Sequence, residues 1–217
     1  EIKDHLANIT DYAVDYLGEV VADYRSSYPR RTTIGSFDKV DVREAAVRNL
    51  SLRYDGKTGY LGYNVSSGRE LFKVSAYDRI LVVRASGTYS VINVPEKLFV
   101  DKGMLSCGLA DKEILSEKTF NVVYKDSKSN YPYLKRTKIE QYILNRGYEL
   151  VPKNAKILAL TTRDGVVANV KYKKKKNIRV LEEDFPVDDY LVKGVKAQGV
   201  RLATREASSA RFVARKG

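Results

Sequence analysis

The hydrophobic period of this chain changes near residue 48, and this change constrains the fold more than any other feature of the sequence. Before it, residues 2–28 carry apolar side chains in alternating steps of four and three, which predicts one long α-helix stopped by Pro29. After it, apolar residues recur with a period of about two, which is typical of β-strands. The sequence therefore predicts a helical start followed by a mainly β region.

The predicted helix carries a single narrow apolar stripe. The stripe consists of Ile2, Leu6, Ile9, Ala13, Tyr16, Val20 and Tyr24. A long helix with one such stripe packs poorly alone, so we expect it to lie against a partner helix, in the same molecule or across a dimer. The alternative is a helix that lies on its own domain.

Turn signals divide the β region into short strand-forming runs. The predicted hairpins pair residues 50–54 with 57–65, 80–84 with 88–94, 120–124 with 131–136, and the two halves of 155–176. Further strands are expected at 70–74, 105–109, 148–151 and 190–202. Turn centres near residues 56, 87, 127 and 165 are roughly 31, 40 and 38 residues apart, which is the range of repeated β units such as propeller blades. We therefore predict a propeller-like repeat of about four hairpin blades; a β-sandwich would accept the same strands.

The stretch 155–176 shows the pattern most clearly. Asp164-Gly165 is a strong signal for a two-residue hairpin turn, because both central positions of that turn need φ > 0. After it, Val166, Ala168, Val170 and Tyr172 share one face of a strand. Residues 157–160 are apolar on both faces, which predicts a strand sandwiched between neighbouring sheets. The stretch ends in four consecutive lysines that no core could accept.

Charge and composition restrict the function. The net charge is +12, of which +9 falls in residues 151–217, so the expected partner is nucleic acid or an anionic membrane surface. No apolar run approaches the roughly 18 to 20 residues that span a bilayer, which favours nucleic acid. The single cysteine fits a cytoplasmic setting. Cys107 and His5 are the single cysteine and histidine, so an internal disulfide, a thiolate metal cluster and a histidine-based catalytic triad are excluded. The start without methionine, with no signal-type segment, predicts an excised piece of a larger protein.

Several motifs resemble those of one protein family. Tyr28-Pro29-Arg30-Arg31-Thr32 with Ile34 resembles the end of the cleavage domain in the A subunits of bacterial type IIA DNA topoisomerases, the gyrase and topoisomerase IV family. There a coiled-coil helix ends before a flexible link to a C-terminal β-pinwheel. Residues 80–95 with Lys102-Gly103, and residues 190–202, resemble blade elements of that pinwheel. The resemblance implies a coiled-coil helix end over 1–34, a linker over 35–47 and a β-pinwheel DNA-binding domain over 48–217.

Two departures refine what the resemblance implies. The Arg-Tyr-Thr catalytic motif is missing, since Val47-Arg48-Asn49 has Asn where tyrosine is needed. The nucleophile is therefore expected upstream, with no catalytic residue or metal site in this piece and ATP and Mg used by other domains of the parent enzyme. The gyrase wrapping box, a Gln-Arg-Arg-Gly-Gly-type run, is also missing, which favours a topoisomerase IV-type subunit that decatenates and relaxes DNA. The implied partners are double-stranded DNA and the ATPase B subunit, in an A2B2 heterotetramer near the nucleoid and away from membranes.

Basic residues at strand ends and turns are the candidate DNA contacts, because stacked blades leave only a rim exposed. They are Arg84, Lys135, Arg136, Lys138, Arg163, Lys171, Lys173, Lys174, Lys175, Lys176, Arg179, Lys193, Lys196 and Arg201. Lysine dominates over 171–176, which suits diffuse phosphate contact more than base recognition. The lysine run can also be a solvated loop, and Tyr131 and Tyr133 can be a stacking platform or ordinary packing. Alternative functions are a gyrase-type wrapping domain, a basic β module that binds acidic proteins, and an RNA-binding β module.

Overall fold

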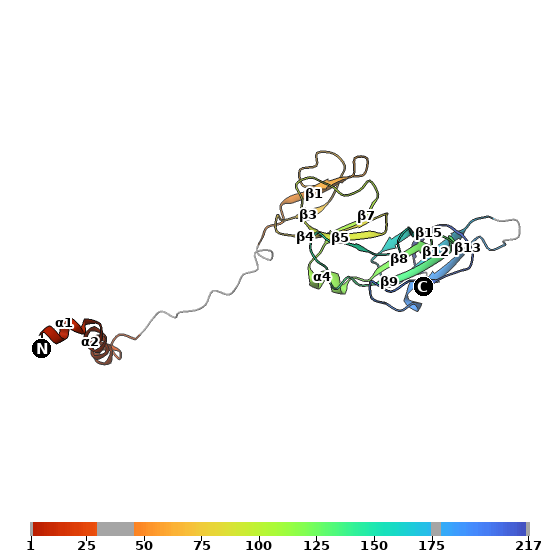
Figure 1. The fold of residues 1–217 in the computed structure, drawn as a ribbon. Helices are drawn as coiled ribbons and strands as arrows, with labels where there is room; N and C mark the ends of the chain where they lie inside the picture. Colours follow the sequence, from red (N-terminus) through yellow and green to blue (C-terminus); the bar gives the residue numbers. More distant parts are fainter. Residues whose placement is uncertain (1, 30–45, 175–178, 216–217) are drawn as a thin grey trace. The chain divides into compact units, whose positions relative to one another are not determined.

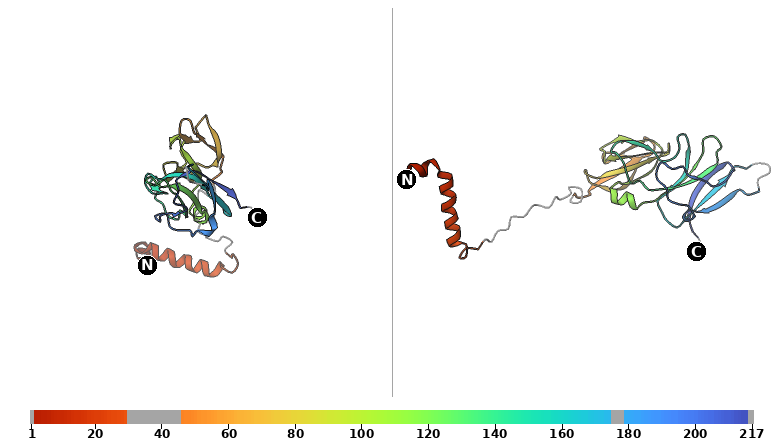
Figure 2. Two further views of the ribbon diagram at one scale, coloured as in Figure 1. Left: turned by 90° about the vertical axis from the view of Figure 1, so that its right-hand side faces the viewer. Right: turned by 60° about the horizontal axis from the view of Figure 1, so that its bottom comes forward.

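The computed structural model describes residues 2–29, 46–174 and 179–215, which belong to two compact units, residues 1–40 and 41–217. In the first unit, α1 (Ile2–Ala7) and α2 (Ile9–Tyr24) replace the single predicted helix (Figures 1 and 2). The predicted N-terminal helix is confirmed, but it is interrupted at Asn8, which lies between the two helices with a non-helical φ of −118° and ψ of 37°; asparagine readily leaves helical geometry.

The apolar stripe of the first unit is exposed apart from the half-buried Val20. No residue of α1 or α2 is buried, so the expected partner helix stays a prediction. The helix ends at Tyr24, five residues before Pro29. Residues 30–45, which contain Arg30, Arg31 and most of the predicted linker, lie outside the described residues.

In its described residues, the second unit contains four antiparallel sheets (Figure 1). The first sheet, β3-β1-β2-β6, consists of β1 (Leu50–Asp55), β2 (Tyr60–Gly62), β3 (Arg69–Val74) and β6 (Leu98–Phe99). The second, β10-β5-β4-β7, consists of β4 (Arg79–Arg84), β5 (Thr88–Asn93), β7 (Met104–Leu109) and β10 (Gly147–Glu149). The third, β11-β8-β9-β14, consists of β8 (Phe120–Lys125), β9 (Pro132–Thr137), β11 (Lys156–Thr161) and β14 (Val200–Arg201). The fourth, β13-β12-β15, consists of β12 (Val166–Tyr172), β13 (Glu182–Pro186) and β15 (Ala207–Ala214).

Four blade-like sheets confirm the predicted fold class. The hairpins β1–β2, β4–β5 and β8–β9 form as predicted. In the β4–β5 turn, Gly87 has a φ of +88°, a conformation that side chains with a Cβ rarely adopt. The sequence did not predict the short helices α4 (Lys112–Glu117) and η1 (Val187–Asp189), or the strands β6, β13 and β15.

The fourth predicted hairpin is wrong in its pairing. Gly165 turns the chain with a φ of +63°, but β11 pairs with β8 in the third sheet, while β12 pairs with β13 and β15 in the fourth. The Asp164-Gly165 turn therefore connects two sheets. Local turn residues set the direction of the chain, whereas the partner of each strand depends on distant residues.

Three short strands belong to a sheet other than that of their neighbours in the chain. β6 pairs with β2, β10 with β5 and β14 with β9, so each joins the sheet before the one that its flanking strands build. We call β6, β10 and β14 the exchanged strands. Each of the first three sheets is completed by a later segment of the chain.

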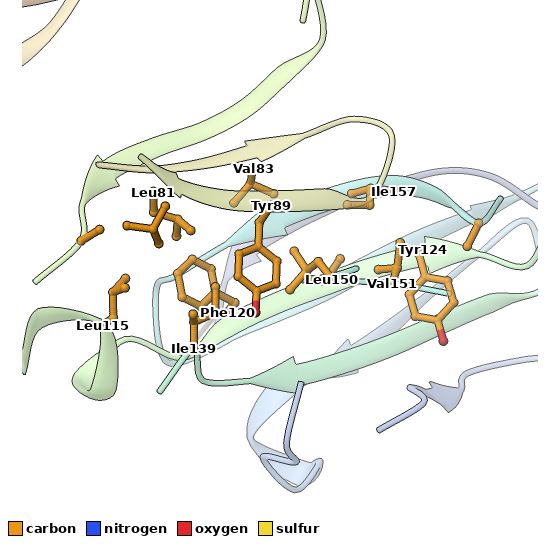
Figure 3. Close-up of a cluster of buried hydrophobic side chains, with 14 residues drawn as sticks. Leu81, Val83, Tyr89, Leu115, Phe120, Tyr124, Ile139, Leu150, Val151 and Ile157 are labelled. Atoms are coloured by element: carbon orange, nitrogen blue, oxygen red, sulfur yellow. The ribbon is translucent and has the colours of Figure 1, made fainter. Parts of the chain in front are cut away.

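The core lies between consecutive sheets, in three clusters. On β4, Ile80 and Val82 pack toward the first sheet, and Leu81 and Val83 pack toward the third. Figure 3 shows the latter cluster, in which Leu81, Val83 and Tyr89 of the second sheet meet residues of the third. The last cluster joins the third and fourth sheets. Face-to-face packing of blades, predicted from strands that are apolar on both sides, is thus confirmed for β4, β8 and β11.

Candidate nucleic-acid interface

Lys135 does not lie on an exposed rim, and this prediction is wrong. Its side chain is 4% exposed, and its Nζ donates hydrogen bonds to the carbonyl oxygens of Leu150 (2.7 Å) and Val195 (2.5 Å). Burial lowers the pKa of Lys135 to about 8, because the charged form is poorly solvated there. This lysine links β9 to two distant segments of chain.

Arg136 is also used inside the fold. Its side chain is 10% exposed; Nε donates to Asn121 (3.0 Å), and Nη1 to the carbonyl oxygens of Val187 and Tyr190 (2.9 Å each). Nη2 donates to Asp188 at 3.1 Å. The guanidinium therefore fastens η1 to the third sheet and has little surface left for a phosphate.

Arg84 occupies a similar position in the second sheet. It is half-buried, and its guanidinium donates to the Val100 carbonyl (2.9 Å) and the Ser90 hydroxyl (3.0 Å). Burial lowers the pKa of Arg84. Because Val100 directly follows β6, Arg84 supports an exchanged strand.

The remaining described candidates are exposed, apart from the half-buried Lys138. Four of them, Lys171, Lys173, Lys174 and Arg179, line one cavity of about 660 Å³ together with Tyr172, Val180, Leu181, Glu182 and Ser208. We call this cavity, with its four cations Lys171, Lys173, Lys174 and Arg179, the basic hollow. Lys175 and Lys176 lie outside the described residues. The structure thus brings together the part of the lysine run that it describes and Arg179, which follows the undescribed residues 175–178.

Two lysines of the basic hollow have carboxylate neighbours. The Nζ of Lys171 lies 3.7 Å from Glu182, and that of Lys173 lies 2.8 Å from Glu206. Exposed ion pairs contribute only about 0–1 kcal/mol, so a phosphate can compete for these lysines. The strand β15 supplies Ser208, whose hydroxyl donates to the Lys171 carbonyl at 3.1 Å. This side of the cavity could not be predicted from the sequence, because residues 207–214 contain few strong strand formers.

A second set of cations lies on the third sheet. Thr137 and Lys193 form an isolated parallel bridge. The backbone of Lys193 therefore lies in space beside that of Lys138, although the two residues are distant in the sequence. Arg201 lies on β14 opposite Tyr133. Lys196 lies in the exposed segment between them. Arg163 stands apart in the connection from β11 to β12, and its carbonyl accepts a hydrogen bond from Asn121.

Aromatic and acidic residues near these cations have structural roles. Tyr133 stacks on Tyr124 with ring centroids 5.4 Å apart and planes 13° apart, which supports packing over a stacking platform for bases. In the part of the chain that the structure describes, no group of histidine, cysteine or acidic side chains could hold a metal ion. None of the described helices is both long and apolar enough to cross a membrane.

The buried Lys135 makes a pH-dependent prediction. Its folded pKa of about 8 lies below the ordinary value of 10.5, so between these two values the unfolded chain binds more protons and stability rises with pH. Relative to Lys135→Met, we expect the free energy of unfolding of the unsubstituted protein to rise by about 2–3 kcal/mol between pH 7 and 10.5. A neutral amine still has two N–H donors for the two carbonyls. Urea unfolding of both proteins between pH 7 and 10.5 tests this prediction. If the free energies of unfolding of the two proteins changed in parallel with pH, the prediction would be contradicted.

The fold and the basic surface define a class, a β-repeat domain of stacked antiparallel sheets with a cationic end. Residues 51–212 match the family described as the topoisomerase C-terminal domain of Bacteroidota, so the chain belongs to this family. It is 24% identical over 211 residues to the A subunit of DNA topoisomerase 4 from Borreliella burgdorferi, an alignment that covers 97% of this chain and 33% of that protein. The crystal structure of the C-terminal domain of DNA topoisomerase IV aligns with a TM-score of 0.45 and 11% identity, covering 76% of this chain and 60% of that one. The family resemblance of the sequence is therefore confirmed.

Proposed function

We propose that this chain binds and bends duplex DNA as the C-terminal domain of a topoisomerase IV-type A subunit, and presents that DNA for strand passage. The basic hollow on the fourth sheet is the observation that carries this proposal, together with membership of the topoisomerase C-terminal domain family. Three of its four cations are lysines, compact charges that suit phosphates of any sequence. Binding of this kind does not read bases.

The stacking of the sheets supports contact along a stretch of DNA. Packed sheets lie about 10 Å apart, and a duplex presents a phosphate charge about every 1.7 Å of its axis. Cations on the third sheet (Lys138, Lys193 and Arg201) and on the fourth would therefore meet phosphates that are separated by several charges along the same stretch of duplex. Bending a 20 to 30 base-pair site by 40 to 90° costs on the order of 1–6 kcal/mol, which several phosphate contacts can offset at modest salt.

The wider setting belongs to the same proposal. The chain spans about a third of the length of the topoisomerase protein that it matches. We propose that a cleavage tyrosine, ATP and Mg are supplied by other parts of the enzyme, which forms an A2B2 complex with a B subunit in the cytoplasm. The proposed activity of the whole is decatenation and relaxation of DNA.

Binding to a fluorescently labelled duplex of 30 base pairs across a salt series tests the proposal. We expect log affinity to fall linearly with log salt concentration, with little change between unrelated sequences. Energy transfer between the duplex ends should rise on binding if the DNA bends. An affinity independent of salt would contradict the proposal and favour a module that binds acidic proteins. Tighter binding to RNA hairpins than to DNA would favour the RNA-binding alternative.

A further inference from the structure

The fourth sheet lacks the strand that completes the other three. In the first three sheets, a hairpin's second strand (β2, β5 or β9) has the first strand on one side and an exchanged strand on the other. In the fourth sheet, β13 holds the corresponding position beside β12. Among the described residues, no strand pairs with the other edge of β13. At the opposite end of each sheet, the outer edge of β3, β7, β11 or β15 is also unpaired among the described strands. This feature is common to all four sheets, whereas the unpaired edge of β13 distinguishes the fourth sheet.

The register shows which backbone groups this edge offers. The Tyr172 N–H donates to the Leu181 carbonyl at 2.8 Å, so in the antiparallel ladder Val170–Glu183 and Ala168–Phe185 are hydrogen-bonded pairs. Glu182 and Asp184 belong to the alternating pairs, whose N–H and C=O groups point away from β12. Glu182 and Asp184 therefore present two donors and two acceptors, and Pro186 at the end of the strand adds a carbonyl but no N–H.

The side chains beside these groups are acidic. Glu182 and Asp184 are both exposed; Glu182 lies 3.7 Å from Lys171, and Asp184 accepts a hydrogen bond from Asn169 at 2.7 Å. Two copies of β13 paired with each other would place carboxylates against carboxylates, which is destabilising. The edge is thus unsuited to self-pairing and complementary to a basic strand.

The exchanged strands show what kind of segment such an edge holds. They are two to three residues long: β6 is Leu98-Phe99, β10 is Gly147-Tyr148-Glu149, and β14 combines an apolar residue, Val200, with a basic one, Arg201. Just before β13, Val180 and Leu181 are 41% and 43% exposed and offer apolar contact to an added strand.

We propose that the free edge of β13 binds a short, extended, basic segment of a partner protein as the fourth strand of the fourth sheet. Main-chain hydrogen bonds to Glu182 and Asp184 supply the pairing, and their carboxylates select lysine or arginine at alternate positions. Glu182 also lines the basic hollow, so DNA bound there would compete with the basic segment. The inference nevertheless goes beyond DNA binding, because backbone pairing at β13 does not require it.

The test uses three capped octapeptides added to the whole chain. The first peptide alternates Val and Arg, and the second alternates Val and Glu. The third has the Val-Arg sequence with the backbone amide of each Arg methylated, because these are the amides that would pair with Glu182 and Asp184. The measurement is amide hydrogen exchange, followed residue by residue by NMR. We expect only the unmethylated Val-Arg peptide to slow exchange at Glu182 and Asp184, by about tenfold. No slowing would overturn the proposal, and equal slowing by the methylated peptide would reduce it to charge attraction alone.

Two variants sharpen the result. Glu182→Pro removes an outward N–H without removing a hydrogen bond to β12, so peptide binding should fall at least about fivefold. Glu182→Lys should shift preference from the Val-Arg to the Val-Glu peptide. Glu140→Lys, at another exposed glutamate, is the matched control for net charge and should behave as the unsubstituted protein. A dimer in sedimentation that Glu182→Pro abolishes would identify a second copy as the occupant and overturn the assignment to a basic partner.

Discussion

Replacing Lys171, Lys173, Lys174 and Arg179 together by Ser is expected to weaken duplex binding by about 10- to 100-fold near 0.1 M salt. These four cations line one cavity, so their loss removes several phosphate contacts at once. The slope of log affinity against log salt should become shallower by about two to four, since each lost contact contributes about 0.9. Two of the four also face carboxylates, which places the lower bound nearer two.

A matched variant separates site from net charge. Four exposed lysines elsewhere, Lys57, Lys102, Lys112 and Lys153, can be changed to Ser with the same loss of charge. If the basic hollow is the site, this control keeps most of the affinity. Equal losses in both variants would mean that DNA is attracted by the overall charge and that the hollow has no special role.

Gly62→Ala is expected to destabilise the protein by about 2–3 kcal/mol. A Cβ on Gly62 would lie 2.0 Å from the carbonyl oxygen and 2.5 Å from the carbonyl carbon of Glu96. Both are backbone atoms, so relief requires moving the segment that leads into β6. The exchanged strand should loosen first, with faster amide exchange at Val100, whose N–H donates to Gly59. Urea unfolding and hydrogen exchange measure the two effects.

Gly147→Ala is the matched control for this prediction. Gly147 begins the exchanged strand β10, and a Cβ there would meet no atom within 4 Å. Its unfolding free energy should stay within about 0.5 kcal/mol of the unsubstituted protein. If Gly62→Ala also changed the free energy of unfolding by less than about 0.5 kcal/mol, the prediction would be wrong. The backbone before β6 would then move away from the added Cβ at little cost.

The strands that could be predicted are those with strong local signals. The β4–β5 hairpin has consecutive strand formers on both sides of Gly87, and it forms as expected. The partners of β11 and β12 could not be predicted, because each pairs with residues far along the chain and the Asp164-Gly165 signal is satisfied by a turn between sheets. The strand β13 could not be predicted from the sequence, because Glu182, Glu183 and Asp184 have low strand propensity.

The candidate site shows a similar division. The sequence located the lysine run, and the structure places its described members in one hollow. It could not show that Lys135 and Arg136 point inward, because the carbonyls that receive Lys135 lie 15 and 60 residues away in the chain. Charge is visible in a sequence, whereas the direction of a side chain depends on which distant segments pack beside it.

The exchanged strands have a consequence for how the domain is made and how it can change. The first sheet is complete only when the ribosome has released Phe99, the second after Glu149 and the third after Arg201. During synthesis, each of the first three sheets can thus be completed only after part of the next sheet has been synthesised. For the same reason, deleting one blade from the gene would strip a strand from the blade before it, so blade number should change in evolution only where the cut respects these overlaps.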